Sequence, residues 1–253
     1  MMFVQRKQKQ SVNLAENAGA AVRRVFARPA VMLAALAALA LAVAATPVSA
    51  EQAWSGAFGA PVVKVASVRM SARWKEILAE RPELLFSGAC GEAAACDDPL
   101  VQKWRALRAR QATGLVSEAD AIQAVNAMAN QGVRFVEDDR LYGVADYWAS
   151  PAETLRKGAG DCEDLAILKW AMLVALGVDP EGLRLDIGVD TNRRQGHAVL
   201  VADADGARLV LDNLADAVRP DTERKGFQPL YALGVNGAWL HGAVRRQDKI
   251  AAF

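Results

Sequence analysis

A single cysteine, Cys162, stands where a glycine-rich stretch meets a long apolar segment of the chain. Gly158 and Gly160 precede it, and leucine and methionine then recur at helical spacing as far as Gly177. We therefore predict that Cys162 lies in the first turn of a buried helix. The free N–H groups at a helix start carry partial positive charge and favour a thiolate, the form of cysteine that attacks carbonyl groups. The sequence thus predicts a nucleophile, and a small buried core cysteine is the alternative interpretation.

A histidine and an aspartate follow the cysteine, each inside a short strand-like run. The order Cys162, His197, Asp212 is the one expected of a thiol acyl-transfer enzyme. His197 would take the thiol proton and later protonate the leaving amine, and Asp212 would hold the imidazole by a hydrogen bond. The N–H of Cys162 would serve as an oxyanion donor. Without these companions, His197 would be a core histidine and Asp212 a carboxylate that caps a turn.

Three carboxylates, Asp161, Glu163 and Asp164, flank the cysteine. One interpretation is that they cap the helix and complement its dipole. However, carboxylates beside a nucleophilic cysteine oppose thiolate formation by like-charge repulsion, and a hard cation with oxygen ligands would relieve that conflict. Asp161, Glu163 and Asp164 are therefore candidate ligands of calcium (Ca2+), which backbone carbonyls, water or other residues would have to complement. A zinc site is not expected, because the chain has only two histidines and no Cys-x-x-Cys pair.

Residues 1–50 have the composition of a secretory signal peptide. Basic residues precede an apolar run over residues 30–45, and small residues end at Ala50, where we expect cleavage. An uncleaved membrane anchor is the alternative, although the run is shorter than the ~20 residues of a spanning helix. Export predicts a protein of the periplasm.

Removal of the signal peptide also changes the charge of the chain. Residues 1–50 hold six of the 30 basic and one of the 29 acidic residues, so 24 basic and 28 acidic residues remain, a formal net charge of −4. This balance gives no electrostatic reason to expect nucleic acid as a partner.

Four further residues have less context in the sequence. Cys90 and Cys96 are expected to pair in an oxidising compartment, which leaves Cys162 free; if they stay reduced, nothing changes for Cys162. The aromatic residues around Trp148 are expected in the core, with a place in a substrate groove as the alternative. His241 is expected at the surface.

Helical patterns come first in the chain and strand patterns second. We predict helices over residues 71–86, which Pro82 can split, and over 98–114, 117–132, 150–158 and 162–177. We predict strands over residues 183–189, 197–202, 208–214, 229–233 and 238–240, with a hairpin turn at 203–206. This order favours an α+β domain over residues 71–253 with an antiparallel sheet. Residues 51–70 are expected to form an N-terminal segment that crosses the surface.

The motifs around these residues resemble the bacterial transglutaminase-like cysteine proteinase family, in particular its LapG-type periplasmic adhesin proteases. The resemblance covers residues 70–240 and depends on four motifs, Asp146–Pro151, Gly160–Asp164, His197–Leu200 and Leu211–Leu214. It implies a papain/transglutaminase-like fold, in which a helical lobe with the nucleophile helix packs on the antiparallel sheet. It also implies a calcium-dependent endopeptidase.

The resemblance extends to single residues and to partners. Cys162, His197 and Asp212 match the family's catalytic triad, and Asp161 and Glu163 match its calcium ligands, with Asp164 as a weaker third. The implied substrate is a large secreted adhesin, cut near its N-terminus at a di-alanine site and released from the outer membrane, which promotes biofilm dispersal. The implied inhibitor is an inner-membrane receptor that senses cyclic-di-GMP. Two alternatives stay open: a transglutaminase-like amide transferase, and a non-catalytic calcium-binding interaction module.

Overall fold

The structure is a computed structural model that describes residues 54–65, 71–86 and 98–242. The signal peptide predicted over residues 1–50 and the predicted Cys90–Cys96 pair lie outside these residues and stay predictions. In the part of the chain that is described, no helix combines the length and the apolar character of a membrane span.

The helices lie mostly in the first half of the described chain. They are α2 (Ser71–Ala79), α3 (Pro82–Phe86), α4 (Pro99–Ala112), α5 (Glu118–Gly132), α6 (Asp138–Leu141), α7 (Pro151–Lys157) and α8 (Cys162–Leu176), with 3-10 turns η1 (Pro180–Gly182) and η2 (Asp221–Glu223). Pro82 divides the predicted 71–86 segment, because a proline without an N–H can start a helix but not continue one. The carboxylate of Asp98 caps α4 and the hydroxyl of Ser117 caps α5. The predicted helices are confirmed, each to within a few residues.

The longer strands form one antiparallel sheet. They are β1 (Val62–Val65), β4 (Leu183–Asp190), β5 (Gln195–Ala204), β6 (Ala207–Asp212), β7 (Ala215–Pro220), β8 (Phe227–Gly234) and β9 (Gly237–His241), in the order β1-β9-β8-β4-β5-β6-β7. The predicted turn between β5 and β6 is present, and Asp205 and Gly206 both adopt positive φ, 50° and 77°, as a tight hairpin turn requires. The predicted α+β fold with an antiparallel sheet is therefore confirmed.

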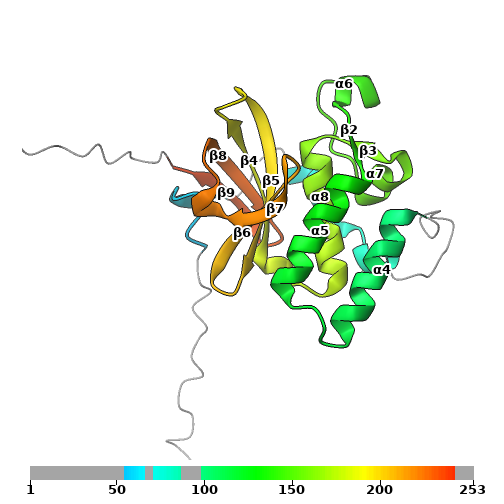
Figure 1. Ribbon diagram of the computed structural model, residues 1–253. Helices are drawn as coiled ribbons and strands as arrows, with labels where there is room; N and C mark the ends of the chain where they lie inside the picture. The colour runs from blue at the N-terminus through cyan, green and yellow to red at the C-terminus, as the bar shows by residue number, and fades with distance from the viewer. Residues whose placement is uncertain (1–53, 66–70, 87–97, 243–253) are drawn as a thin grey trace, which may run out of the picture. The chain divides into compact units, whose positions relative to one another are not determined.

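Helix α8 is the centre of the core. Figure 1 shows α8 beside α5, with both helices to one side of the sheet, and α8 packs on β4, β5 and β6. Its side chains are buried on nearly all sides, among them Leu165, Ile167, Leu168 and Met172. A helix that is apolar all round has to be enclosed by other elements. This packing fixes the N-terminus of α8, and with it Cys162, against the sheet.

Residues 51–70 are predicted to cross the surface, but the described part of this segment contributes buried side chains and a strand. Trp54 and Ala57 are buried, and they pack with Val199 and Phe227 in a second core cluster. Because side chains alternate along a strand, this cluster lies on the sheet face opposite α8, whose side is lined by Ala198 and its period-2 neighbours. Strand β1 then pairs along β9 at the edge of the sheet.

His241 is the clearest disagreement with the sequence prediction. Its side chain is 0% exposed, not at the surface, and its Nε2 lies 2.7 Å from Oδ1 of Asp186. The ring also packs edge-on against Trp54, with 5.5 Å between ring centroids. Asp186 is 55 residues away in sequence, so no local pattern could indicate this pair.

A small parallel pair positions the entry to α8. Strand β2 (Arg134–Phe135) aligns with β3 (Ala159–Gly160), so the glycine-rich stretch before the cysteine is extended and pinned. Gly158, in the left-handed region at φ 57°, ends α7 immediately before it. The chain therefore reaches Cys162 from a fixed direction.

Candidate active site

The backbone around Cys162 is set by its neighbours. Asp161 is the N-cap residue of α8, and its N–H donates to Oδ2 of Asp164 at 3.4 Å. A Cβ atom on Gly160 would lie 2.6 Å from the Cβ of Asp164, so only glycine fits there. Cys162 is the first residue of α8, and an N–H in the first turn has no partner inside its own helix. The predicted helix-start cysteine is confirmed.

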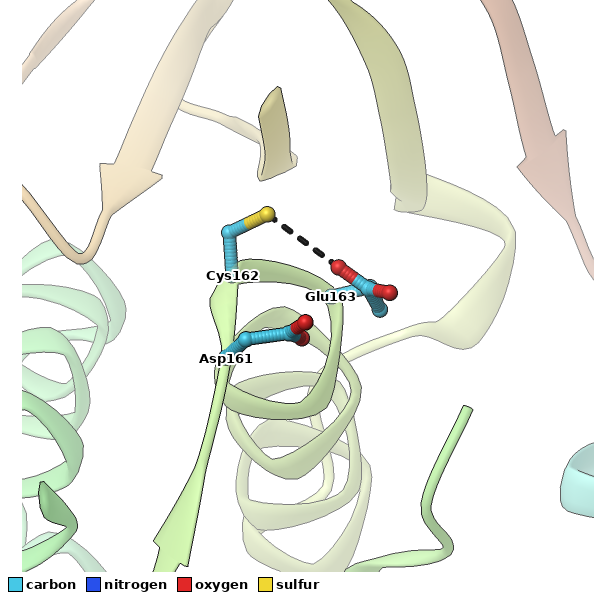
Figure 2. A group of neighbouring side chains, drawn as sticks. All are labelled: Asp161, Cys162 and Glu163. Carbon is cyan, nitrogen blue, oxygen red and sulfur yellow. Dashed lines mark hydrogen bonds between the residues drawn. The ribbon is translucent and has the colours of Figure 1, made fainter. Parts of the chain in front are cut away.

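The thiol of Cys162 is half-buried, and its proton points to the neighbouring Glu163 carboxylate. Sγ donates a hydrogen bond to Oε2 of Glu163 at 3.1 Å, as Figure 2 shows. Burial raises the pKa of the Cys162 thiol above its usual range, and the Glu163 charge raises it further, whereas a backbone hydrogen bond from Ala198 lowers it. Ala198 is the residue after His197 on β5. The thiol thus sits against the strand that carries the histidine.

His197 and Asp212 are hydrogen bonded to each other inside the molecule. Nε2 of His197 lies 2.8 Å from Oδ1 of Asp212, and the two residues are 3% and 5% exposed. Burial alone would raise the pKa of Asp212, but the hydrogen bond and charge of His197 lower it to about 2. The carboxylate is therefore ionised at neutral pH and holds one ring nitrogen, which leaves Nδ1 of His197 for another partner.

Of the three predicted catalytic residues, His197 and Asp212 are hydrogen bonded to each other, and Cys162 lies against the strand that carries His197. Among the described residues, the side-chain hydrogen bond of Cys162 goes to Glu163, and none joins its sulfur to His197. The link between the two is the Ala198 amide. A thiolate–imidazole contact would require the thiol to leave Glu163.

Carboxylates gather below the thiol in three overlapping groups. Each group offers ligand atoms within 4.8 Å of one another: Asp161 with Cys162 and Glu163, Asp138 with Asp161 and Asp164, and Asp138 with Asp146 and Glu163. Figure 2 shows the Asp161 and Glu163 carboxylates on the same side of the first turn of α8. The predicted acidic cluster therefore exists, and it is larger than predicted.

The predicted acidic residues do not all have the same surroundings. Both oxygens of Asp164 accept backbone hydrogen bonds, from Ala149 at 2.7 Å and from Asp161 at 3.4 Å, and the residue is 0% exposed. Asp164 thus joins the loop before α7 to the start of α8. By contrast, Oδ1 of Asp161 is buried with no hydrogen-bond partner among the described residues.

Burial and mutual repulsion disfavour the charged forms of this cluster. Burial raises the pKa of Asp161, and the charge of Glu163 adds to the effect. Burial likewise raises the pKa values of Glu163 and Asp138, and raises that of Asp164 to about 7. Carboxylates that are crowded and buried in this way either take up protons or bind a cation.

A hard cation fits the donor set. Apart from Sγ of Cys162, the candidate ligand atoms are carboxylate oxygens, as Ca2+ prefers. Oδ1 of Asp138 and Oδ1 of Asp161 have no hydrogen-bond partner among the described residues. Both residues are buried, since Asp138 is 3% exposed and Asp161 is 6% exposed. Buried polar atoms are normally paired, so these two oxygens are placed as ligands would be.

Sequence reasoning missed Asp138 and Asp146 as members of this cluster. Asp138 lies in an acidic run, Glu137–Asp139, whose position relative to α8 depends on the β2–β3 pair. Asp146 belongs to one of the motifs on which the family resemblance depends, but only the fold brings its carboxylate close to that of Glu163. Only the tertiary structure brings these residues together.

Trp148, in the aromatic motif before α7, is partly buried. The Trp148 side chain packs against the main core cluster, and its carbonyl accepts a hydrogen bond from Nε of Arg73 at 2.8 Å. Ser150 and Glu153 form a capping box at the start of α7. These contacts agree with the core placement expected for the aromatic residues.

Residues 92–226 match the sequence model of the family described as bacterial transglutaminase-like cysteine proteinase, BTLCP. The chain belongs to this family. The match covers more than half of the chain of this BTLCP proteinase, including α8, the histidine strand β5 and the whole acidic cluster. The helical lobe with α8 packed on the antiparallel sheet is the papain/transglutaminase-like fold that the sequence resemblance implied.

Solved structures of LapG from Legionella pneumophila are similar to this BTLCP proteinase. One is 29% identical, covers 63% of this chain and 85% of LapG, and has a TM-score of 0.49. A calcium-bound form is 30% identical over 58% of this chain and 82% of LapG, with a TM-score of 0.48. An EGTA-treated form is 29% identical over 64% and 84%, with a TM-score of 0.49. No curated protein is similar enough in sequence to count as a match.

Proposed function

We propose that this BTLCP proteinase is a calcium-dependent cysteine endopeptidase with Cys162 as nucleophile, His197 as general base and Asp212 as the residue that orients the imidazole. The observation that carries the proposal is the buried 2.8 Å hydrogen bond between His197 and Asp212, one residue from the amide that meets the Cys162 thiol. A buried, ionised aspartate that fixes a histidine beside a helix-start cysteine is the arrangement that thiol proteases use.

The proposed reaction begins with the thiol exchanging its bond to Glu163 for one to His197. Nδ1 of His197 takes the thiol proton, and the thiolate adds to the carbonyl carbon of the scissile peptide bond. The N–H of Cys162 donates to the oxyanion that forms. Collapse of this intermediate breaks the C–N bond, and the leaving amine takes the proton from His197. Water then hydrolyses the thioester with His197 again as base, which releases the new carboxyl group and restores the thiol.

The carboxylates Asp138, Asp146, Asp161 and Glu163 would hold the calcium ion, with Asp164 shaping the site from the side. A cation held there would supply positive charge that offsets the carboxylates, lowers the cost of forming a thiolate and weakens the hold of Glu163 on the thiol proton. Oδ1 of Asp138 and Oδ1 of Asp161, which have no hydrogen-bond partner in the described part of the chain, support this assignment.

The resemblance to LapG-type proteases supports a proposed cellular setting. The substrate is a large secreted adhesin that is cleaved in its N-terminal region and so released from the cell surface, which promotes biofilm dispersal. The protein acts in the periplasm after removal of residues 1–50, and an inner-membrane cyclic-di-GMP receptor holds it inactive. The net charge of −4 after residue 50 agrees with a protein partner and not with nucleic acid.

The test incubates the chain from Glu51 with the N-terminal fragment of a candidate adhesin from the same organism, in calcium or in a chelator. We expect a defined cut in calcium, its loss with the chelator, and its loss in Cys162→Ala. An isopeptide product without cleavage would favour the amide transferase. Binding without any product would favour the non-catalytic module.

A further inference from the structure

Arg224 lies against the side of Asp212 that faces away from His197. Its Nε donates to Oδ2 of Asp212 at 2.9 Å, and its Nη2 donates to Oδ2 of Asp190 at 3.0 Å. The side chain is only 18% exposed, and the two carboxylates are 6% and 4% exposed. Burial alone would lower the pKa of Arg224, but the bonds to Asp190 and Asp212 raise it. This ion-paired guanidinium is a fixed part of the molecule and not a surface charge.

The two oxygens of Asp212 have separate donors. Oδ1 accepts from the N–H of Leu214 at 2.9 Å and meets Nε2 of His197, whereas the donor to Oδ2 within the described residues is Arg224. Rotation of an aspartate carboxylate about its last bond is broad and roughly two-fold. A donor on each oxygen stops that rotation, so Arg224 determines where Oδ1 lies for His197.

Nη2 of Arg224 reaches Asp190, at the turn before the histidine strand β5. Asp190 ends β4, and its Oδ1 accepts from the N–H groups of Asn192 at 3.0 Å and Arg193 at 2.9 Å. This turn leads directly into β5, whose third residue is His197. The planar fork of one arginine therefore ties the carboxylate of the proposed triad to the base of the strand that carries its imidazole.

We propose that Arg224 is a positioning residue, which holds Asp212 and the start of β5 in the relative geometry that the His197–Asp212 hydrogen bond needs. The expected effect on kcat rests on the proposed function, whereas the expected effect on the His197–Asp212 hydrogen bond does not depend on it. Arg224 contacts no reacting atom, so it acts through its neighbours. These are Asp212 and Asp190, by hydrogen bonds, and Phe227, whose ring centroid lies 6.0 Å from the guanidinium and which packs edge-on against His197.

Charge alone does not account for the arrangement. The buried Lys169 of α8 also interacts with Asp212 and Asp216 electrostatically, and burial lowers its pKa to about 7. Asp212 therefore has another cation nearby, but the structure gives no hydrogen bond between the two among the described residues. What Arg224 adds is direction: two N–H groups at fixed angles to two carboxylates.

The test compares Arg224→Lys and Arg224→Gln with the same two changes at Arg219. Arg219 lines the same cavity of about 460 Å³ as Arg224, but its side chain is 63% exposed and its ion pair with Glu223 is long, at 3.7 Å. We expect Arg224→Lys, which keeps the charge and loses the fork, to lower kcat about 10- to 100-fold with KM within about twofold. The Arg219 variants should keep the kcat of the parent protein.

A spectroscopic measurement separates this inference from the proposed function. The chain has two histidines, so the ring N–H signals in a 1H–15N NMR spectrum can be assigned with His197→Gln. In both Arg224 variants the His197 Nε2 signal should move towards that of a weaker hydrogen bond. The signal of His241, paired with Asp186, should stay in place. This measurement holds even if no substrate is cleaved.

Three results would overturn the inference. The first is a His197 signal and a kcat equal to those of the Arg219 variants. The second is a shift of both histidine signals together, as in a general loss of structure. The third is full kcat in Arg224→Lys, which would leave only a charge effect. If the Arg224 variants do not fold, Asp190→Asn is the second test, since it frees one arm of Arg224. It should shift the His197 signal in the same direction, and an unchanged signal would contradict the proposal.

Discussion

The Cys162 thiol donates a hydrogen bond to the Glu163 carboxylate at 3.1 Å. The residue that follows the proposed nucleophile thus holds it in its unreactive, protonated form. Burial and the charge of Glu163 both raise the pKa of the thiol, although the helix start acts in the opposite direction. The reactivity of the cysteine is therefore decided by what happens to its acidic neighbours.

Calcium should activate the cysteine itself, independently of any substrate. Because a cation among the carboxylates offsets the charges that raise the pKa of Cys162, alkylation by iodoacetamide should be at least about tenfold faster in calcium than in chelator at pH 7.5. Peptide mass spectrometry follows the modification of Cys162 alone. Equal rates in the two conditions would contradict the proposed electrostatic role of calcium.

Glu163→Gln should separate the two functions of this carboxylate. Without calcium, the variant should alkylate faster than the parent protein, because the charge that raises the pKa of Cys162 is gone. Calcium should then accelerate the reaction much less, since a ligand is lost. Asp203→Asn, a change at a side chain that is 40% exposed and pairs with the buried Arg184 on the sheet, is the matched control and should behave like the parent protein in alkylation.

The stability of the metal-free protein should fall as the pH rises from about 4 to about 7. Burial raises the pKa of Asp164 from 3.8 to about 7, so the folded state binds more protons than the unfolded state in this window. Glu163 and Asp138 act in the same direction. Lys169, whose pKa burial lowers from 10.5 to about 7, has the opposite effect, but only above pH 7.

Calcium binding should reverse this trend, because its ligands must be deprotonated. The difference in Tm between calcium and chelator should therefore grow from pH 5 to pH 7. Thermal unfolding at pH 5, 6 and 7 measures it. A difference that stays constant over this range would show that the cluster does not release protons to a cation.

Gly160→Ala should damage the site, whereas Gly158→Ala should cost only stability. A Cβ atom at position 160 would overlap Asp164, which supports the start of α8, so calcium affinity and Cys162 alkylation should both fall. At Gly158 nothing lies within 4 Å of the new atom, and the expected cost is about 1–2 kcal/mol for a positive φ. Calcium titration and thermal unfolding of both variants distinguish the two effects. Equal calcium affinities would argue against a role for Gly160 in the site.

Asp212→Asn should keep the fold and lose catalysis. The amide can still meet His197, but it removes the charge that favours the imidazolium and allows the wrong tautomer. We expect kcat to fall about 10²- to 10⁴-fold, and Tm to fall as well, because the amide leaves the buried guanidinium of Arg224 without its charged partner. A variant with parental kcat would remove Asp212 from the proposed triad.

Much of the local structure follows from the sequence alone. The helix from Cys162 to Leu176 is predicted because its apolar spacing, its acidic start and the stop at Gly177 are all local features, and Gly177 does adopt the left-handed conformation. The strands around β4, β5 and β6 are predicted for the same reason. The acidic residues next to Cys162 must lie near its sulfur, since they are its neighbours along one helical turn.

The tertiary structure decided what depends on contacts between distant parts of the chain. The fold brings Asp138 and Asp146 close to Glu163, and it brings Arg224, the residue after η2, to Asp212 at the end of β6. His241 is buried through a partner 55 residues away. Backbone periodicity records only which face of an element is apolar; which charged groups then share a low-dielectric site is set by packing. That packing decides their pKa values and hence the chemistry proposed here.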